Sequence, residues 1–205
     1  MKNNKPSKKF DKTIFDGLFM KNTVLASGLV VAPIIVSATT VQSAFALVIA
    51  FSLITFLTVL ISSFVPRDMV YAVRIILYTV IAAMVYVPVA VFADSFMEQQ
   101  FSSLGIMFPL LITNSLIITR SEIHFFKLDK LRMLAEVFFY VLGFDVVAII
   151  VGFVREIFAT GAIGDKIIGI HFTLPFLSTT FGGFIVVGIL AALLKKIKLI
   201  IRSNS

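Results

Sequence analysis

The sequence predicts an all-α polytopic membrane protein, with six transmembrane helices arranged as two inverted three-helix repeats. Of its 205 residues, 59% are hydrophobic and only 14% are charged, whereas about a quarter of the residues of a soluble domain are charged. The mean hydropathy is +1.05. The first and fourth apolar segments are short and interrupted by glycine or proline, which is typical of the broken helices of inverted repeats.

The chain divides into one membrane domain between two basic tails. Residues 1–22 are polar and basic, and apolar residues at helical spacing from about residue 10 predict an amphipathic helix on the membrane surface. The membrane domain covers residues 23–195, with repeats at about 23–93 and 104–195, and residues 196–205 form the second tail. The formal net charge of +7 is explained by membrane topology and anionic lipid, so we expect no nucleic-acid partner.

Six apolar spans make up the membrane domain. They cover residues 24–40, 44–64, 70–92, 105–119, 134–158 and 174–194. A helix needs about 20 apolar residues to cross the hydrocarbon layer, and the first and fourth spans fall short of this. Gly28 and Pro33 interrupt the first span, and Gly105 and Pro109 interrupt the fourth. In the sixth span, three glycines predict a close-packing face: Gly182, Gly183 and Gly188.

Charged residues predict the orientation of the spans. Lys and Arg collect in the N-terminal tail, the second and fourth connections and the C-terminal tail, whereas the third connection carries Asp94 and Glu98 without a basic residue. The positive-inside rule therefore places both termini in the cytoplasm. We expect Arg74 to snorkel to the cytoplasmic surface, and Arg155 and Glu156 to form a local ion pair at the end of the fifth span.

The two short spans also match each other in sequence. Residues 33–38 read PIIVSA and residues 109–114 read PLLITN, so each has a proline, three aliphatic residues, a hydroxyl and a small or polar residue. With three spans in each half, the second half enters the membrane from the opposite side. Asn114 and Thr113 are expected to satisfy backbone groups that the break leaves unpaired, or, with Pro33, to line a carrier or ion path.

Four blocks of the chain resemble the small membrane subunits of the Rnf complex and of the sodium-pumping NADH:quinone reductase, chiefly the E-type and D-type members. The blocks are residues 22–36, 73–76, 104–122 and 151–161. The resemblance implies pairing with a homologous subunit (A-type in Rnf) in the inverted orientation within a bacterial cell membrane, beside flavin-bearing subunits. It further implies a [2Fe–2S] cluster held by two cysteines from each of the paired subunits, and electron flow coupled to ion movement.

The sequence departs from this family at the cluster ligands. The family cysteines fall on Ala32 and Ser115, and the chain has no cysteine. Fe–S clusters need thiolates, or histidine in the Rieske case, and His124 and His171 both lie outside the spans. Three explanations remain: a cluster-free paralogue whose carrier sits on a partner, which we favour; an engineered replacement of cysteine; or a scaffold adapted to transport.

Asp145 is the one acidic residue near the middle of a predicted span. Carboxyl groups at this depth are costly and usually face a cavity or a partner, so Asp145 is a candidate ion or proton site, with a hydrogen-bonded packing acid as the alternative. No catalytic constellation, metal motif or nucleotide-binding motif is evident.

These features predict a non-catalytic subunit of an ion-translocating electron-transfer complex. The alternative is a transporter for an ion or for a small redox molecule such as flavin or quinone, with the broken helices as its substrate site.

Overall fold

The computed structural model describes residues 22, 24–164, 166–167 and 173–203. The predicted amphipathic helix over residues 10–21 lies outside this part of the chain. The elements, in chain order, are α1 (Val31–Ser37), α2 (Val41–Ser62), α3 (Tyr71–Ser102), α4 (Met107–Leu110), η2 (Leu111–Thr113), η3 (Leu116–Arg120), α5 (Ser121–Ile123), η4 (Phe125–Lys127), α6 (Lys130–Thr160), β1 (Ala162–Ile163), β2 (Lys166–Ile167), η5 (Pro175–Ser178) and α7 (Thr180–Ser203).

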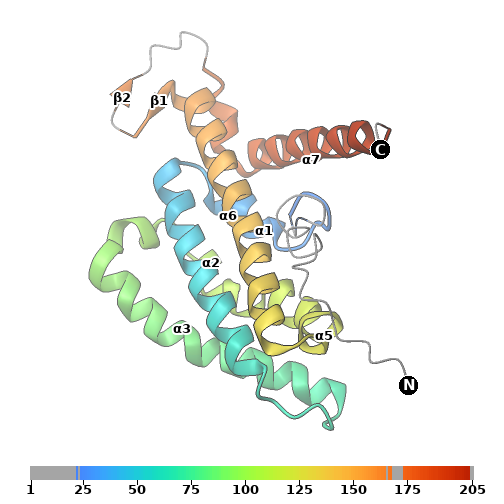
Figure 1. Cartoon of the computed structure of the whole chain (residues 1–205). Coiled ribbons are helices and arrows are strands. Elements are labelled where there is room, and N and C mark those ends of the chain that lie inside the picture. The colour runs from blue at the N-terminus through green and yellow to red at the C-terminus, as the bar shows by residue number, and fades with distance from the viewer. Residues whose placement is uncertain (1–21, 23, 165, 168–172, 204–205) are drawn as a thin grey trace.

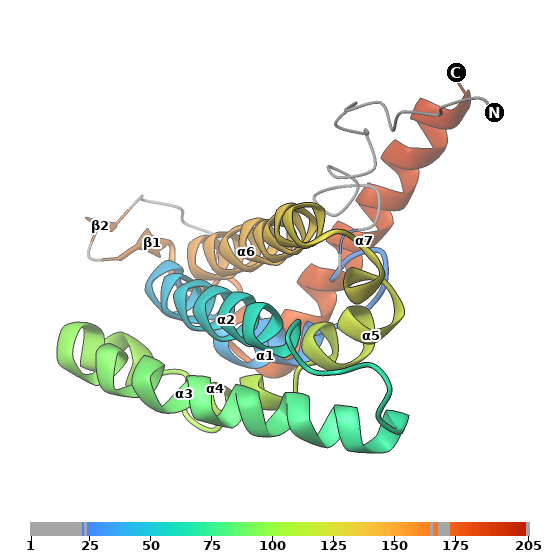
Figure 2. The ribbon, with the colours of Figure 1, turned by 60° about the horizontal axis from the view of Figure 1, so that its bottom comes forward.

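Helix α2 lies at the centre of the molecule, between α3 on one side and α6 on the other (Figure 2). Helices α2 and α6 run in opposite directions (Figure 1). Where their middles meet, the rings of Phe51 and Phe144 stack with centroids 3.7 Å apart. A Cβ added at Gly152 would lie 2.7 Å from the Cβ of Ala44 and 2.8 Å from the carbonyl oxygen of Thr40, so this glycine allows the two helices to touch.

Among the described residues, three helices are long and apolar enough to cross a membrane: Val41–Ser62, Tyr71–Ser95 and Lys130–Thr160. They correspond to the second, third and fifth predicted spans. The first and fourth predicted spans are broken into short helical pieces, as the interruptions in their sequences predict. The part of the chain that is described is thus mostly helical.

Several predicted boundaries are wrong. Helix α3 continues through Pro88 to Ser102, so the acidic third connection is helical rather than a loop. The sixth predicted span begins with a 3₁₀ turn, and α7 starts only at Thr180. The preceding connection contains two short antiparallel strands, with Ala162 paired to Ile167, in a chain expected to be all-α.

Only two of the three predicted packing glycines serve close contact. A Cβ at Gly182 would lie 2.4 Å from the Cα of Leu177, and one at Gly183 would lie 2.7 Å from the carbonyl oxygen of Ile35. A Cβ at Gly188 would meet no described atom within 4 Å, because this glycine lies on the exposed face of α7.

Candidate functional site at the two helix breaks

The first break lies around α1 and is built on an unusual backbone. Gly28 and Val30 have φ angles of 64° and 56°. A positive φ is uncommon for any residue except glycine and is strained for a β-branched one. The turn before it is held by Asn22, whose Oδ1 accepts hydrogen bonds from the main-chain N–H groups of Val24 and Leu25, at 2.9 and 3.0 Å. The amide of Asn22 also donates to the carbonyl oxygen of Gly143 in α6, at 2.8 Å.

The second break has a similar layout. Gly105 has a φ of 51°, and α4 and η2 then carry the chain helically from residue 107 to 113. Asn114 is extended, with ψ at 142°, and the next piece, η3, has π-helical hydrogen bonding. In the first break α1 covers residues 31–37, so each short helical stretch follows a glycine with positive φ.

Asn114 satisfies backbone groups at the second break, as predicted. Its Nδ2 donates to the carbonyl oxygen of Leu111 at 2.9 Å and to Oγ1 of Thr55 at 3.2 Å, and its Oδ1 accepts from the N–H of Ile117 at 3.0 Å. The side chain is 6% exposed, and an unpaired backbone group would be costly at such a depth. Thr55 of α2 is a partner that sequence analysis missed, since nothing in the sequence distinguished it from the other hydroxyl residues of that helix.

The two breaks are neighbours, because α1 contacts α4. The residues at the family's cysteine positions differ in exposure: Ala32 is exposed and Ser115 is half-buried. Pro33 is buried, and Thr113 is exposed with its hydroxyl donating to the carbonyl oxygen of Leu110 at 3.1 Å. A methyl group and one hydroxyl do not fit an iron–sulfur cluster, and the described residues contain no group of three or more His, Asp or Glu that could hold a metal ion.

Arg155 is a central residue of this site, and its predicted ion pair with Glu156 is wrong. The Arg155 side chain is 0% exposed, and its guanidinium donates to five main-chain carbonyl oxygens at the ends of α1 and η5. Those oxygens, at 2.8 to 3.1 Å, belong to Ile35, Ala38, Leu177, Ser178 and Thr179. Carbonyl groups at helix C-termini carry partial negative charge, so the two short helices together take the place of a carboxylate partner.

Glu156 points to a different helix end. Its Oε2 accepts a hydrogen bond of 2.6 Å from the N–H of Val41, and its Oε1 accepts one of 2.7 Å from the N–H of Gly164. Val41 is the first residue of α2, where a carboxylate is stabilised by the helix dipole. The adjacent Arg and Glu therefore fasten the end of α1 and the start of α2 to α6.

Arg74, which we expect to snorkel to the cytoplasmic surface, has partners within the chain. Its guanidinium forms an ion pair with Glu122, and it also donates to the carbonyl oxygens of Arg67 and Met69. Glu122 in turn accepts from the hydroxyl of Tyr78 at 2.8 Å. These contacts tie the start of α3 to α5.

Asp145 is not part of the helix breaks. It lies on α6, where its Oδ2 accepts a hydrogen bond of 2.9 Å from the hydroxyl of Ser52 on α2. A pocket between these two helices contains both side chains, and described residues of neither break line it.

Comparison of the sequence with known proteins assigns the chain to a family. Residues 10–192 match the family described as "Rnf-Nqr subunit, membrane protein". Three relatives, each named as the E-type subunit of an ion-translocating oxidoreductase complex, come from Vibrio cholerae, Shewanella oneidensis and Vibrio vulnificus. They are 31%, 28% and 30% identical, over 87%, 87% and 75% of this chain and 84%, 84% and 67% of their own lengths. The chain belongs to the Rnf-Nqr family of membrane subunits.

Proposed function

We propose that this chain is a membrane subunit of an ion-translocating oxidoreductase complex, in which it scaffolds or relays electron flow without ligating a [2Fe–2S] cluster of its own. The observation that carries the proposal is the family match from residue 10 to residue 192. Relatives covered over 84% of their lengths are named as the E-type member of such a complex.

The proposed arrangement is six spans in two inverted repeats, with both termini in the cytoplasm. Two features support it. The short helical stretches 31–37 and 107–113 each follow a glycine with positive φ. In addition, α2 and α6 would be equivalent in the two halves, and they cross in opposite directions where the rings of Phe51 and Phe144 stack.

Within the complex, this chain's own residues would hold the two helix breaks in place. Asn114, whose amide also donates to the hydroxyl of Thr55, pairs the backbone of the second break, and Arg155 pairs that of the first. Ala32 offers no ligand atom and Ser115 only a hydroxyl, so the electron carrier, such as a flavin, would belong to partner subunits.

An apolar stripe on α3 supports assembly with another membrane subunit or with lipid. Its residues are exposed, and they recur every three or four positions along one face: Val73, Ile76, Val80, Met84, Val87 and Val91. Helix α3 is also the least buried of the three membrane-length helices in the described part of the chain. Such a face must be covered by lipid or by another helix.

Mild detergent purification of the native complex, with visible and EPR spectra and an iron and flavin count, tests the proposal. We expect a homologous membrane partner and a flavin signal to co-purify with the chain, without a [2Fe–2S] signal. A [2Fe–2S] signal from a complex of this chain and its partner would refute the cluster-free assignment. A colourless chain that purifies alone and transports a solute in liposomes would refute the whole proposal in favour of a transporter.

A gain-of-function variant tests the two alignment positions directly. Replacing Ala32 and Ser115 together by cysteine would restore the two thiolates of this chain at the breaks. In the assembled complex, the double variant is expected to gain a [2Fe–2S] EPR signal if the partner carries its own pair. Each single variant is the matched control, because three thiolates do not complete the set of four.

A further inference from the structure

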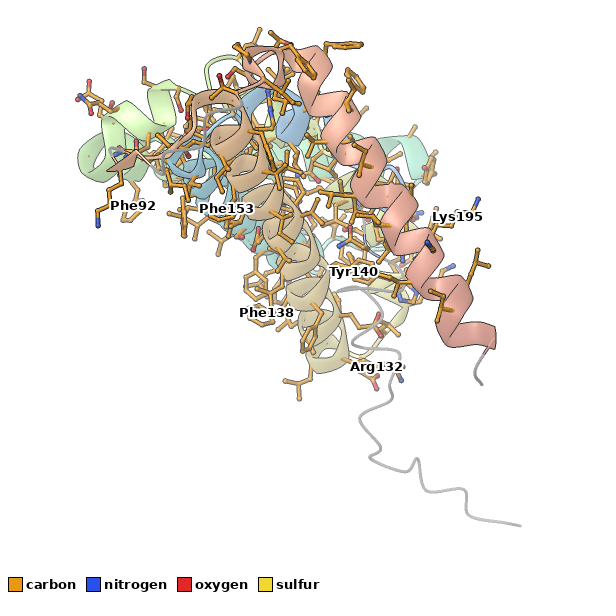
Figure 3. All side chains as sticks on the ribbon, turned by 90° about the horizontal axis from the view of Figure 1, so that it is seen from above. Phe92, Arg132, Phe138, Tyr140, Phe153 and Lys195 are labelled. Atoms are coloured by element: carbon orange, nitrogen blue, oxygen red, sulfur yellow. The ribbon has the colours of Figure 1, made fainter. Side chains whose placement is uncertain are left out.

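A pocket of about 300 Å³ lies between α2 and α6, away from both helix breaks. Its walls are almost entirely hydrocarbon, formed by Leu53, Phe56, Leu57, Phe138, Val141 and Leu142. Leu53, Leu57 and Phe138 are also exposed on the surface, at 36%, 37% and 50%. In Figure 3, Phe138 lies on the flank of α6 that faces away from α7. The pocket therefore opens on an apolar surface at the middle of two membrane-length helices.

One carboxyl group projects into this apolar pocket. Asp145 is 8% exposed, and its Oδ2 accepts a hydrogen bond from Ser52. Its other oxygen, Oδ1, is buried and has no hydrogen-bond partner among the described residues. A buried polar atom without a partner is unusual in a protein, so the carboxyl group of Asp145, which lines the pocket, lacks a contact that buried carboxyl oxygens normally have.

Within the described part of the chain, no other ionisable side chain lines the pocket. Helix α2 contains no charged residue, and the nearest charged residues on α6 are Glu136 and Arg155, nine and ten positions away, or about 14–15 Å along the helix. The hydroxyl of Tyr140, which lies between these two residues in the sequence, accepts a hydrogen bond from Arg120. Helix α7 packs against α6, but its lysines begin only at residue 195.

The polar atoms available decide what the pocket can take. Ser52 and Asp145 are the only polar side chains among its described lining residues, whereas hard metal cations such as Mg²⁺ and Ca²⁺ take six or more oxygen ligands. A bare carboxylate would be very costly in hydrocarbon without a positive partner. Binding of a proton to Oδ1 removes the charge and turns this oxygen into an O–H donor, and the apolar space that the carboxyl group lines suits a small uncharged molecule.

We propose that Asp145 is a proton-binding site whose carboxylic acid faces the lipid phase through the pocket between α2 and α6. The acid is held in place by the hydroxyl of Ser52, and its side chain lines a space that small, uncharged apolar molecules reach from the membrane. This assignment concerns only this chain and does not depend on which carriers its complex contains.

Labelling of membranes that contain the intact complex by dicyclohexylcarbodiimide tests the proposal. This apolar reagent adds to a protonated carboxyl group, and rearrangement to the N-acylurea retains the whole reagent as added mass. We expect mass spectrometry to find the adduct on the peptide that contains Asp145. Asp145→Asn should abolish the adduct, and a water-soluble carbodiimide should leave Asp145 unmodified.

Two matched tryptophan variants on α2 test whether the carbodiimide reaches Asp145 through the pocket, or whether any tryptophan on this helix changes the labelling. Leu57→Trp fills the pocket and should strongly reduce labelling of Asp145. Ile61→Trp, at an exposed position outside the pocket, should leave it unchanged.

Three outcomes would overturn the proposal. An unlabelled Asp145 in folded protein would mean that the carboxyl is not protonated and reachable from lipid. Equal labelling by the water-soluble reagent would place it in contact with water. Labelling of the isolated chain but not of the complex would show that a partner subunit, rather than lipid, covers the pocket.

Discussion

Replacing Arg155 by methionine tests the interpretation that one side chain holds the end of α1. Methionine keeps much of the aliphatic volume but none of the donors, so five carbonyl oxygens at 2.8 to 3.1 Å lose their partner. A net hydrogen bond to a charged group contributes roughly 1.5–3 kcal/mol, and five would give well over 7 kcal/mol. Removing the guanidinium also removes its own burial cost of several kcal/mol, so we expect a net loss of about 2–5 kcal/mol.

The loss of stability in Arg155→Met should be seen in the whole protein and, more strongly, around α1 and η5. Unfolding in mixed micelles of rising SDS content, followed by far-UV circular dichroism, measures the change in free energy, and the method suits a chain with no tryptophan. Hydrogen exchange should rise at residues 31–38 and 175–179 before it rises in α3, because this side chain holds α1 and η5 and does not contact α3.

Two further variants make the experiment selective. Arg155→Lys keeps the charge but replaces the planar five-donor group by a single ammonium, so its stability should fall between those of the methionine variant and the original chain. Arg67→Met, which removes an exposed guanidinium 5.9 Å from the ring centre of Phe126, should cost less than about 1 kcal/mol. An Arg155→Met protein as stable as the original, or one whose exchange rises equally everywhere, would refute the reasoning.

Three other substitutions follow from the same contacts. Asn114→Leu removes three buried hydrogen bonds at the second break and should lower the free energy of unfolding by about 2–4 kcal/mol; a change below about 1 kcal/mol in the same SDS titration would contradict its role. Gly183→Val places a Cβ 2.7 Å from a main-chain oxygen of α1 and should destabilise the protein. Gly188→Ala, with no described atom near its Cβ, should leave the stability unchanged. Equal stability of the two variants would argue against close contact of α7 with α1. Glu156→Ala exposes the N–H of Val41 and should increase hydrogen exchange in the first turn of α2, with a stability loss of about 1 kcal/mol; unchanged exchange there would show that the carboxylate does not hold the helix start.

The sequence located the helix breaks because local chemistry causes them. Glycine and proline change the backbone at their own positions, and an Asn after three aliphatic residues and a Thr marks where the chain leaves the helix. The amide of Asn114 does bond to the carbonyl oxygen of Leu111, three residues earlier. Local signals of this kind can be read directly from a sequence.

Arg155 shows where such reasoning fails. Adjacent Arg and Glu suggested a local ion pair, but successive residues of a helix point in different directions. Arg155 instead reaches Ile35, 120 residues earlier, and Glu156 reaches Val41, 115 residues earlier. Those partners are main-chain groups, which every residue possesses, so no pattern of side chains in the sequence could have predicted them.

By itself, the sequence determined the class of the protein, the two interrupted segments and the absence of cluster ligands, because hydropathy, backbone-breaking residues and missing thiols are properties of the residues themselves. Only the tertiary structure decided which helix ends Arg155 and Glu156 hold, that Ser52 and Asp145 share an apolar pocket, and that α3 is one continuous helix through Pro88. These features depend on which segments lie side by side. The packing of α2 between α3 and α6 brings together segments that are far apart in the sequence, and local sequence patterns do not carry that information.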